Sequence, residues 1–408
     1  MFKTKEFTDD EWEAIFEELK ANPNVYGLPQ RVPGSALLGS FNIRKLGKVE
    51  NRSANTWKFL GIVCKSFDLI AIQEVMDDMD GIHRLMEEME GEYKLIASDK
   101  TGTYPGDAGL GERLAFLYRT STVELGEVIS DVTYDRSKVT EIMFDHLDEI
   151  NAIKQDFDND MKDYESGKRK GKPKLEPPTF LAFIRSPYCV SFKMKGEEPG
   201  YEPYSFMAVN AHLIYGKPKD RWREFEAIMN WIRDRVVQQD KMYYPNFILL
   251  GDLNLDYDDP EKDHDKMEKF MKSIDEGTSK EIHVNFPFLD IHPNETAHFT
   301  SNVLLTQRYD QIGMFFRDDD GQGKGYPTHK ENAIMGKDEQ GPDYGVFNFS
   351  DLFANVLKDG KRMNDLGKDP KKALVKRFQH EVSDHMPIWL RLKLRKSDDT
   401  RRNKKRRV

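Results

Sequence analysis

Apolar residues along this chain gather into short strand-like runs, and these alternate with segments in which apolar residues recur every three or four positions. The strand-like runs cover residues 36–43, 68–75, 93–97, 114–118, 123–129, 180–184, 188–194 and 247–250. The segments with helical period cover residues 53–65, 81–89 and 220–237. This mixture predicts sheets covered by helices.

The two ends of the chain depart from the alternating pattern. Thr8 and Glu11 form a capping box that predicts a short helix to about Lys20, within an N-terminal extension of residues 1–35. One large domain follows over residues 36–392, and residues 393–408 form a basic tail. A chain of 408 residues with 38% apolar content is long enough to bury the core of such a domain.

Two segments interrupt the domain. Within an insertion of about residues 135–178, apolar residues at helical spacing predict a single amphipathic helix over 139–164, followed by a flexible basic loop. We expect this helix to pack on the side of the domain. Residues 317–345, rich in Asp, Gly and Lys, predict a mobile surface loop near the functional motifs.

Composition limits the compartment. No apolar run approaches the roughly 20 residues of a membrane span, so we expect no insertion into a membrane. The first residues lack the apolar core of a signal peptide. Cys64 and Cys189 each lie within an apolar run, which indicates buried thiols in a reducing compartment. These features predict an intracellular, cytoplasmic protein, and a nuclear location is an option because of the basic tail.

Charge is unevenly distributed along the chain. Residues 391–408 carry ten Lys or Arg against two Asp, and the whole chain carries −9, which leaves −17 on the rest. Such an acidic body is not typical of a general nucleic-acid binder, because attraction to phosphates depends on clustered Lys and Arg. The tail is either a solvated end, a nucleic-acid contact or a nuclear targeting signal.

Five polar motifs each close or precede an apolar run: "SFNIR", "IAIQEV", "VNAHL", "LLGDLNLD" and "VSDHMPIWL". Together they supply two imidazoles, three carboxylates and two amides, from Asn42, Glu74, His212, Asp252, Asn254, Asp384 and His385. These are the groups needed to hold a divalent metal and to hydrolyse a phosphate ester. The motifs therefore predict a hydrolytic site.

The carboxylates in these motifs favour a hard cation. Glu74 ends a buried run, where an ionised carboxylate is costly unless a cation accompanies it, so we expect it to bind Mg²⁺ or Mn²⁺. A partner Arg or a helix cap is the alternative for Glu74. Asp252 and Asn254, two positions apart on extended chain, point the same way and can share one phosphate or water, although Asp and Asn also serve simply as turn formers.

Possible carboxylate partners and neighbouring motifs indicate a catalytic role for two histidines. His385 precedes an apolar strand, and Asp310 of "RYDQIGMF" begins another, so a hydrogen bond between them would orient the ring and raise its basicity. That pair can activate water. His212 ends a third strand and can act as an acid or as a clamp on the leaving oxygen. A lone histidine at a strand end is more often structural, and the other motifs reverse that preference here.

With these residues in order, the chain resembles the endonuclease/exonuclease/phosphatase superfamily, most closely its deoxyribonuclease-I-like branch. The resemblance rests on "FNIR", "IQEV", "GDLN" and "SDH" and spans about residues 36–392. It implies an α/β (α+β) fold, a four-layer α/β sandwich with two mostly antiparallel sheets packed face to face and helices outside.

The resemblance also implies roles for individual residues. Glu74 and Asn42 would bind the metal with Asp384; His385, oriented by Asp310, would be the base; His212 would act on the acid side; and Asp252 and Asn254 would contact phosphate and water. Asp99 of "IASDKTG" would be the carboxylate that supports His212. Arg44 and Arg185 would contact the phosphate unless they form surface ion pairs, and Asn348 and Thr300 would contact the substrate.

One departure from the branch bears on the substrate. Where deoxyribonucleases that cut duplex DNA carry an arginine two residues after the metal-binding Glu, this chain has Met76. The resemblance predicts a metal-dependent phosphodiesterase with nucleic acid as its substrate. The alternatives are a phosphatase or lipid phosphodiesterase acting on inositol phosphates or sphingomyelin-like headgroups, and an inactive binding module on the same fold.

Overall fold

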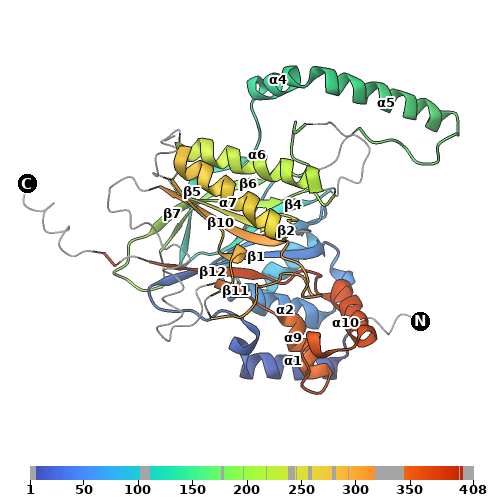
Figure 1. Cartoon of the computed structure of the whole chain (residues 1–408). Coiled ribbons are helices and arrows are strands. Elements are labelled where there is room, and N and C mark those ends of the chain that lie inside the picture. Colours follow the sequence, from blue (N-terminus) through green and yellow to red (C-terminus); the bar gives the residue numbers. More distant parts are fainter. Residues whose placement is uncertain are drawn as a thin grey trace, which may run out of the picture.

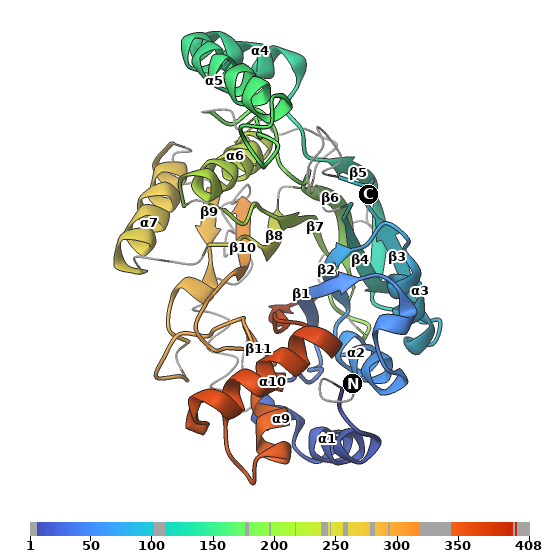
Figure 2. The same cartoon turned by 90° about the vertical axis from the view of Figure 1, so that its right-hand side faces the viewer.

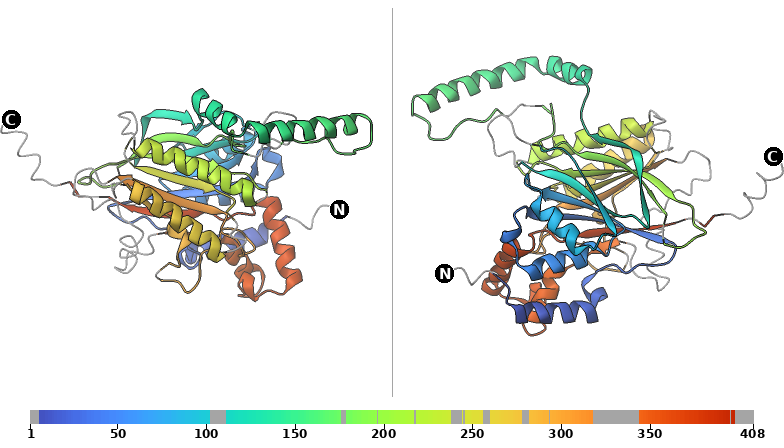
Figure 3. Two further views of the ribbon diagram at one scale, coloured as in Figure 1. Left: turned by 45° about the horizontal axis from the view of Figure 1, so that its top comes forward. Right: turned by 180° about the vertical axis from the view of Figure 1, so that it is seen from behind.

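Two mixed β-sheets packed face to face form the centre of the protein, with helices on the outer face of each (Figures 1 and 3). The computed structural model describes residues 6–101, 111–175, 179–195, 197–216, 218–237, 244, 246–255, 260–277, 282–292, 294–317, 344–394 and 396–397. Within these residues each sheet has six strands. The four-layer α/β sandwich expected from the sequence is thereby confirmed.

The first sheet has the strand order β11-β12-β1-β2-β4-β3. Its strands are β1 (Ser35–Leu46), β2 (Leu69–Val75), β3 (Tyr93–Ala97), β4 (Arg113–Arg119), β11 (Tyr344–Val346) and β12 (Ile388–Lys393). The helices on its outer side are α1 (Asp9–Ala21), α2 (Ala54–Cys64), α3 (Asp80–Glu88), α9 (Phe349–Leu357) and α10 (Lys368–Glu381). Strand β2 is buried along almost its whole length because the opposing sheet and these helices cover both of its faces.

The second sheet has the strand order β5-β6-β7-β8-β10-β9. Its strands are β5 (Val123–Asp131), β6 (Tyr188–Met194), β7 (Tyr204–His212), β8 (Phe247–Asp252), β9 (Ile282–Asn285) and β10 (Asp310–Arg317). Helices α6 (Pro218–Val237) and α7 (Pro260–Gly277) cover its outer face (Figure 2). One parallel pair lies at the centre of each sheet, β1 with β2 and β7 with β8, and the remaining pairs are antiparallel.

The N-terminal helix forms as its capping box predicts. The Thr8 hydroxyl accepts from the Glu11 backbone N–H, and the Glu11 side chain accepts from the Thr8 backbone N–H. The apolar face of α1 buries Trp12, Ile15 and Leu19 in the same cluster as α2 and α9. This N-terminal segment therefore contributes to the hydrophobic layer outside the first sheet.

The inserted helical segment differs from its prediction in two ways. Two helices, α4 (Arg136–Asp145) and α5 (Leu147–Glu165), replace the single helix, with a non-helical residue, His146, between them. Neither helix has a buried residue, and Figures 1 and 3 show the pair standing away from the sheets. The expectation that this segment packs on the side of the domain is wrong.

The run at residues 180–184 is not a strand, in contrast to its apolar pattern. The rings of Phe180 and Phe183 pack against each other, and Phe180 also packs on Tyr134. The Ile184 N–H donates to the Glu224 carboxylate of α6 instead of to a neighbouring strand. Side-chain packing and this hydrogen bond satisfy the segment without a sheet.

Two predicted segments fall outside the described residues: most of the surface loop at 317–345 and most of the basic tail at 393–408. Over the described part of the chain, no helix is both long and apolar enough to cross a membrane.

Candidate active site

The polar motifs converge because of how the strands are paired. Asn42 lies opposite Gln73 on the parallel strands β1 and β2, and His212 lies opposite Asp252 on the parallel strands β7 and β8. The carboxyl ends of parallel strands meet at one edge of a sheet. Asp310 begins β10, which runs antiparallel to β8, so it also lies opposite Asp252. The motifs are therefore brought to the same edge of the sandwich.

The backbone leaves regular geometry at this edge. Glu74 and Asn254 have left-handed backbone angles, with φ of 60° and 49°, which are uncommon for residues other than glycine. The β2–β4 pairing shifts register between Ile72 and Val75, around Glu74. At Gly251, φ is 150° and a Cβ atom would lie 1.9 Å from the Ala211 carbonyl oxygen, so only glycine fits. Strain is thus concentrated where the side chains must turn into the site.

Asn42 lies at the centre of the site and is fully buried. Its Nδ2 donates to Glu74 Oε1 at 3.1 Å and to Asp252 Oδ2 at 3.0 Å, and these two acceptors fix the orientation of its amide. The other Glu74 oxygen accepts from the Lys45 backbone N–H at 2.9 Å. The Asn42 Oδ1 atom is buried and has no hydrogen-bond partner among the described residues. The cluster therefore holds a buried acceptor that no described residue satisfies.

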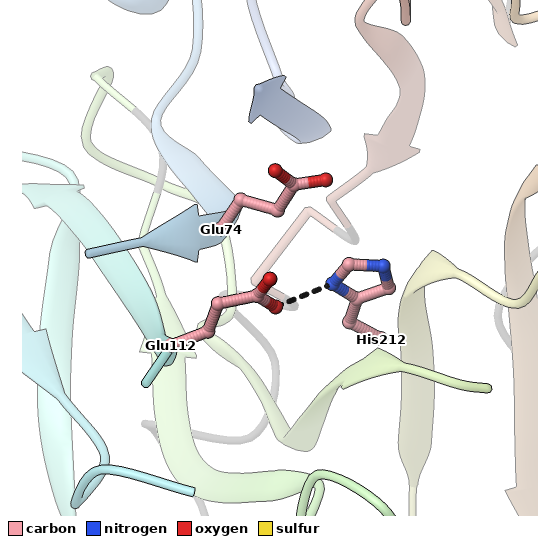
Figure 4. A group of neighbouring side chains, drawn as sticks. All are labelled: Glu74, Glu112 and His212. Atoms are coloured by element: carbon pink, nitrogen blue, oxygen red, sulfur yellow. Dashed lines mark ion pairs between the residues drawn. The ribbon is translucent and has the colours of Figure 1, made fainter. Parts of the chain in front are cut away.

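Two histidine–carboxylate pairs flank this cluster. His385 Nδ1 lies 2.8 Å from Asp310 Oδ2, and His212 Nδ1 lies 3.1 Å from Glu112 Oε2. Figure 4 shows Glu74, Glu112 and His212 at the ends of their strands. In each pair the carboxylate holds Nδ1, which leaves Nε2 as the reactive nitrogen. Both Nε2 atoms lie 3.6 Å from the same oxygen, Asp252 Oδ2.

The charges in the site shift its pKa values. Burial by itself lowers the pKa of His385, but the Asp310 and Asp252 carboxylates outweigh burial and raise it to about 10. Burial by itself raises the pKa of Asp252, but His385 and His212 outweigh it and lower that pKa. Burial raises the pKa of Asp310, although His385 opposes that shift. The arrangement therefore favours a protonated imidazole beside an ionised Asp252.

The carboxylate that supports His212 is Glu112, which corrects the expectation for Asp99. The Asp99 side chain is 85% exposed and forms an ion pair with Arg113. Glu112 is buried, and its Oε2 also lies 2.6 Å from Arg185 Nε. Burial by itself raises the pKa of Glu112, but His212 and then Arg185 outweigh burial and lower it. Arg185 is thus a buried partner of Glu112 and not a surface residue.

The position of Glu112 in the sequence carries a signal of its role. Glu112 directly precedes β4, two positions before the apolar run at 114–118, and β4 runs antiparallel to β2. The start of an antiparallel strand lies at the same edge as the end of its neighbour. A polar residue at the start of an antiparallel strand can therefore reach the site in the same way as one at the end of a parallel strand.

The remaining predicted residues lie in different surroundings. Asp252 Oδ1 accepts from the Asn254 N–H at 3.0 Å, and Asn254 Nδ2 donates to the Leu213 carbonyl at 2.8 Å, so Asn254 joins the ends of β7 and β8. Arg44 Nε lies 3.7 Å from Asp384 Oδ2, and both side chains are about one-third exposed. The Arg44 guanidinium also donates to a carbonyl of α10. Both side chains are open to a ligand from solvent.

The two predicted substrate contacts, Asn348 and Thr300, differ in how the structure uses them. The Asn348 side chain caps α9 by accepting from the Asp351 N–H at 2.9 Å, and it also donates to the Asp351 carboxylate. Thr300 is half-buried, next to the segment whose Asn302 forms a β-bridge with His385. Asn348 is therefore engaged in local structure, whereas Thr300 adjoins the His385 segment.

The donor atoms fit a small divalent cation. Glu74, Asn42 and Asp252 offer carboxylate and amide oxygens, the ligands that Mg²⁺ and Mn²⁺ prefer. One ligand atom each from Glu74, Glu112 and His212 also fall within 4.8 Å of one another. The unpartnered Asn42 Oδ1 is the observation that favours a cation here, because a bound ion would satisfy it.

Comparisons with known proteins find solved structures that are similar to this chain at low identity and low TM-score. No family model and no curated protein matches the chain. An endonuclease/exonuclease/phosphatase family protein from Bacteroides thetaiotaomicron is 16% identical over 88% of this chain and 95% of its own, with a TM-score of 0.42. The human Nocturnin catalytic domain is 11% identical over 89% and 96%, with a TM-score of 0.43. Truncated Caenorhabditis elegans TDP2 is 12% identical over 88% and 97%, with a TM-score of 0.44.

Proposed function

We propose that the protein is a metal-dependent phosphodiesterase that hydrolyses phosphodiester bonds of nucleic acids. The observation that supports this most is the convergence of two histidine–carboxylate pairs on one carboxylate oxygen, Asp252 Oδ2, beside the Glu74 and Asn42 oxygens. Hydrolysis of a phosphodiester needs one group that takes a proton from water and another that gives a proton to the leaving oxygen. The two imidazoles can divide these tasks.

His385 is the proposed base. Asp310 holds its Nδ1, so its Nε2 faces the site, and the carboxylates that raise its pKa also make the ring a stronger proton acceptor. The ring must first lose its own proton, so we expect hydrolysis to accelerate as pH rises through the neutral range. Asp252 and Asn254 are proposed to orient the attacking water and the phosphate.

His212 is the residue that we propose gives a proton to the leaving oxygen. Glu112 holds its Nδ1 and Arg185 holds Glu112, so the ring is fixed from two sides within a buried group. Glu74 and the Asn42 Oδ1 are the proposed ligands of Mg²⁺ or Mn²⁺, with Asp384 as an additional ligand. When bound, such an ion would supply Lewis-acid stabilisation of negative charge on the phosphate.

A small diester tests the chemistry without depending on substrate identity. Purified protein is assayed for release of nitrophenol from bis(p-nitrophenyl) phosphate with Mg²⁺ or Mn²⁺ and with EDTA. We expect metal-dependent hydrolysis that decreases by about 100-fold or more in Glu74→Ala and in His385→Ala. Glu87→Ala and His146→Ala, at exposed positions, are matched controls that should retain activity. Thermal melting establishes that every variant is folded.

Two results would overturn the proposal. Wild-type-like turnover by either site variant would show that these residues do not carry the chemistry. No hydrolysis with either metal would favour a binding module on this fold. A panel of plasmid DNA, single-stranded DNA, RNA and phosphoinositides, with Glu74→Ala as the blank, then tests the substrate class. Phosphate release from phosphoinositides, without cleavage of nucleic acid, would replace the proposed substrate with the alternative one.

A further inference from the structure

A helical arm extends from the domain on the side where the candidate active site lies. The arm comprises α4, α5 and a return segment of residues 166–175 that folds back beneath α5 (Figures 1 and 3). The return segment is held to α5 by ion pairs of Lys168 with Asp163 and of Arg169 with Asp160, and its Pro173 is buried. The arm is thus an ordered element with no buried residue in either helix.

The positions of the strand ends show that the arm extends on the side of the site. The site lies where β12 begins, since His385 precedes that strand, and β12 then runs toward the C-terminus on the left of Figure 1. In the same view α5 extends to the right, beyond the strand ends and above α10. Figure 2, which views the molecule from that side, shows α5 above the strand ends. A long substrate lying across the site would therefore pass the arm.

The return segment carries a concentration of positive charge in an otherwise acidic body. Five cations occur within seven residues: Lys168, Arg169, Lys170, Lys172 and Lys174. Asp163 and Asp160 form ion pairs with the first two. Lys170 and Lys172 are exposed and form no ion pair with any residue that the structure describes. Clustered, unpaired cations are the feature that attracts the phosphates of a nucleic-acid backbone.

The apolar residues of the arm argue against a lipid surface as the partner. Three of its five exposed large apolar residues, Met143, Phe144 and Leu147, lie around the break between α4 and α5, whereas Tyr164 and Leu175 lie at the end of α5 and in the return segment. The basic return segment begins beyond the other end of α5, which has 19 residues and so spans about 28 Å. A peripheral membrane contact combines apolar and basic side chains on one surface. Here three of the five exposed apolar residues, including Phe144 as the most exposed, lie the length of a helix away from the basic segment, which favours nucleic acid over a lipid surface.

We propose that the arm binds the sugar–phosphate backbone of an extended nucleic-acid strand whose scissile phosphate lies in the candidate active site. This inference rests on the proposed function and narrows its substrate to a strand long enough to reach the return segment. The length of α5 corresponds to about eight phosphates at the 3.4 Å spacing of one strand in a duplex. Lys170 and Lys172 then provide affinity without base specificity.

Reversing the charge of Lys170 and Lys172 tests binding of nucleic acid separately from hydrolysis. The Lys170→Glu/Lys172→Glu variant is compared with Lys138→Glu/Lys154→Glu, which makes the same charge change on α4 and α5 away from the return segment. Binding of a fluorescent 30-mer oligonucleotide is measured by anisotropy in the Glu74→Ala background, so that no cleavage interferes. We expect the return-segment variant to weaken binding about tenfold at low salt. The plot of log affinity against log salt should become less steep by about 1.4, the value for the loss of two phosphate contacts to a single strand.

The activity assays distinguish a failure of this inference from a failure of the proposed function. Both charge-reversal variants should hydrolyse bis(p-nitrophenyl) phosphate at the wild-type rate, and only the return-segment variant should show a higher KM for the 30-mer. Unchanged affinity and salt slope would overturn the role of the arm even if the diester is hydrolysed. An equal loss in the control variant would show that only overall charge matters. Binding to anionic lipid vesicles that depends on Lys170 and Lys172, without oligonucleotide binding, would assign the arm to a lipid surface.

Discussion

Asn210 offers a direct test of how the two sheets hold the site together. Its Nδ2 donates across the sheet interface to the carbonyls of Ile72 and Ala115, at 3.1 and 2.9 Å, and its Oδ1 accepts from Gln73 Nε2 at 2.7 Å. The two carbonyls belong to β2 and β4, where the pairing shifts register around Glu74. A bulge leaves backbone groups without ladder partners. Asn210 therefore satisfies the backbone irregularity that places Glu74.

The structure sets the expected magnitude for Asn210→Leu. Leucine has a similar size but removes all three hydrogen bonds from a fully buried position. Each bond contributes about 1 kcal/mol net, and each polar group left buried and unpaired costs roughly 1–3 kcal/mol. Because leucine regains some apolar contact, we expect a loss of about 3–5 kcal/mol in the free energy of unfolding. That is a large part of the roughly 5–15 kcal/mol typical of folded proteins.

Urea unfolding followed by tryptophan fluorescence measures this loss. The matched control is Asn246→Leu, which removes one hydrogen bond to the Ser205 carbonyl at a half-buried position and should cost about 1 kcal/mol. Because Glu74 directly follows Gln73, Asn210→Leu should also lower turnover of the diester by about 10- to 100-fold under conditions where it stays folded. An unfolding midpoint and a turnover equal to wild type would refute the idea that this cross-sheet contact supports the site.

Two further predictions concern buried carboxyl groups. Burial raises the pKa of Glu224 to about 7, although two backbone N–H groups donate to it. A carboxyl whose folded-state pKa lies above its ordinary value contributes stability that is present below pH 4.5 and lost as pH rises through 7. Between pH 4.5 and pH 7 we expect the free energy of unfolding of the metal-free wild type to decrease by about 3 kcal/mol relative to Glu224→Gln. Urea unfolding at a series of pH values measures this difference. Parallel curves of unfolding free energy against pH for the two proteins would contradict it. Glu112→Gln removes the carboxylate that pairs directly with the buried Arg185 guanidinium and should cost about 3–5 kcal/mol in the free energy of unfolding. The control is the exposed ion pair of Arg119 with Glu92, where Glu92→Gln should change the free energy of unfolding by no more than about 1 kcal/mol. Equal losses in the two variants would refute the expectation that the buried pair matters more than the exposed one.

Much of the fold could be predicted from the sequence because local patterns carried the information. The capping box at Thr8 formed α1, and the apolar run that became β2 was evident because both faces of that strand are buried. The pattern misled where local periodicity did not reflect tertiary packing. At Phe183 the apolar residues pack in an aromatic cluster instead of a strand, and at His146 a helical period continues through a residue that is not helical.

The candidate site was partly predictable for a similar reason. Glu74 and His385 stand in motifs whose residue types indicate their chemistry, and the structure brings both motifs to one edge. The resemblance implies Asp99 as the carboxylate beside His212, but Glu112 occupies that place. The two carboxylates lie on the connected strands β3 and β4 or just beyond their ends, and which one faces inward depends on strand register. A shift of one residue moves a side chain to the other face of a sheet.

By itself, the sequence determined which chemistry is available: oxygen donors for a divalent cation, two imidazoles, and strands with polar residues at their ends. Residue types decide this because acidity, ligand preference and apolar periodicity are local properties. Only the tertiary structure decided that Glu112 pairs with His212, that Asn42 has an unpartnered oxygen, and that the arm leaves the domain on the side of the site. These depend on strand register and on contacts between residues far apart in the chain, such as the 210 positions between Asn42 and Asp252.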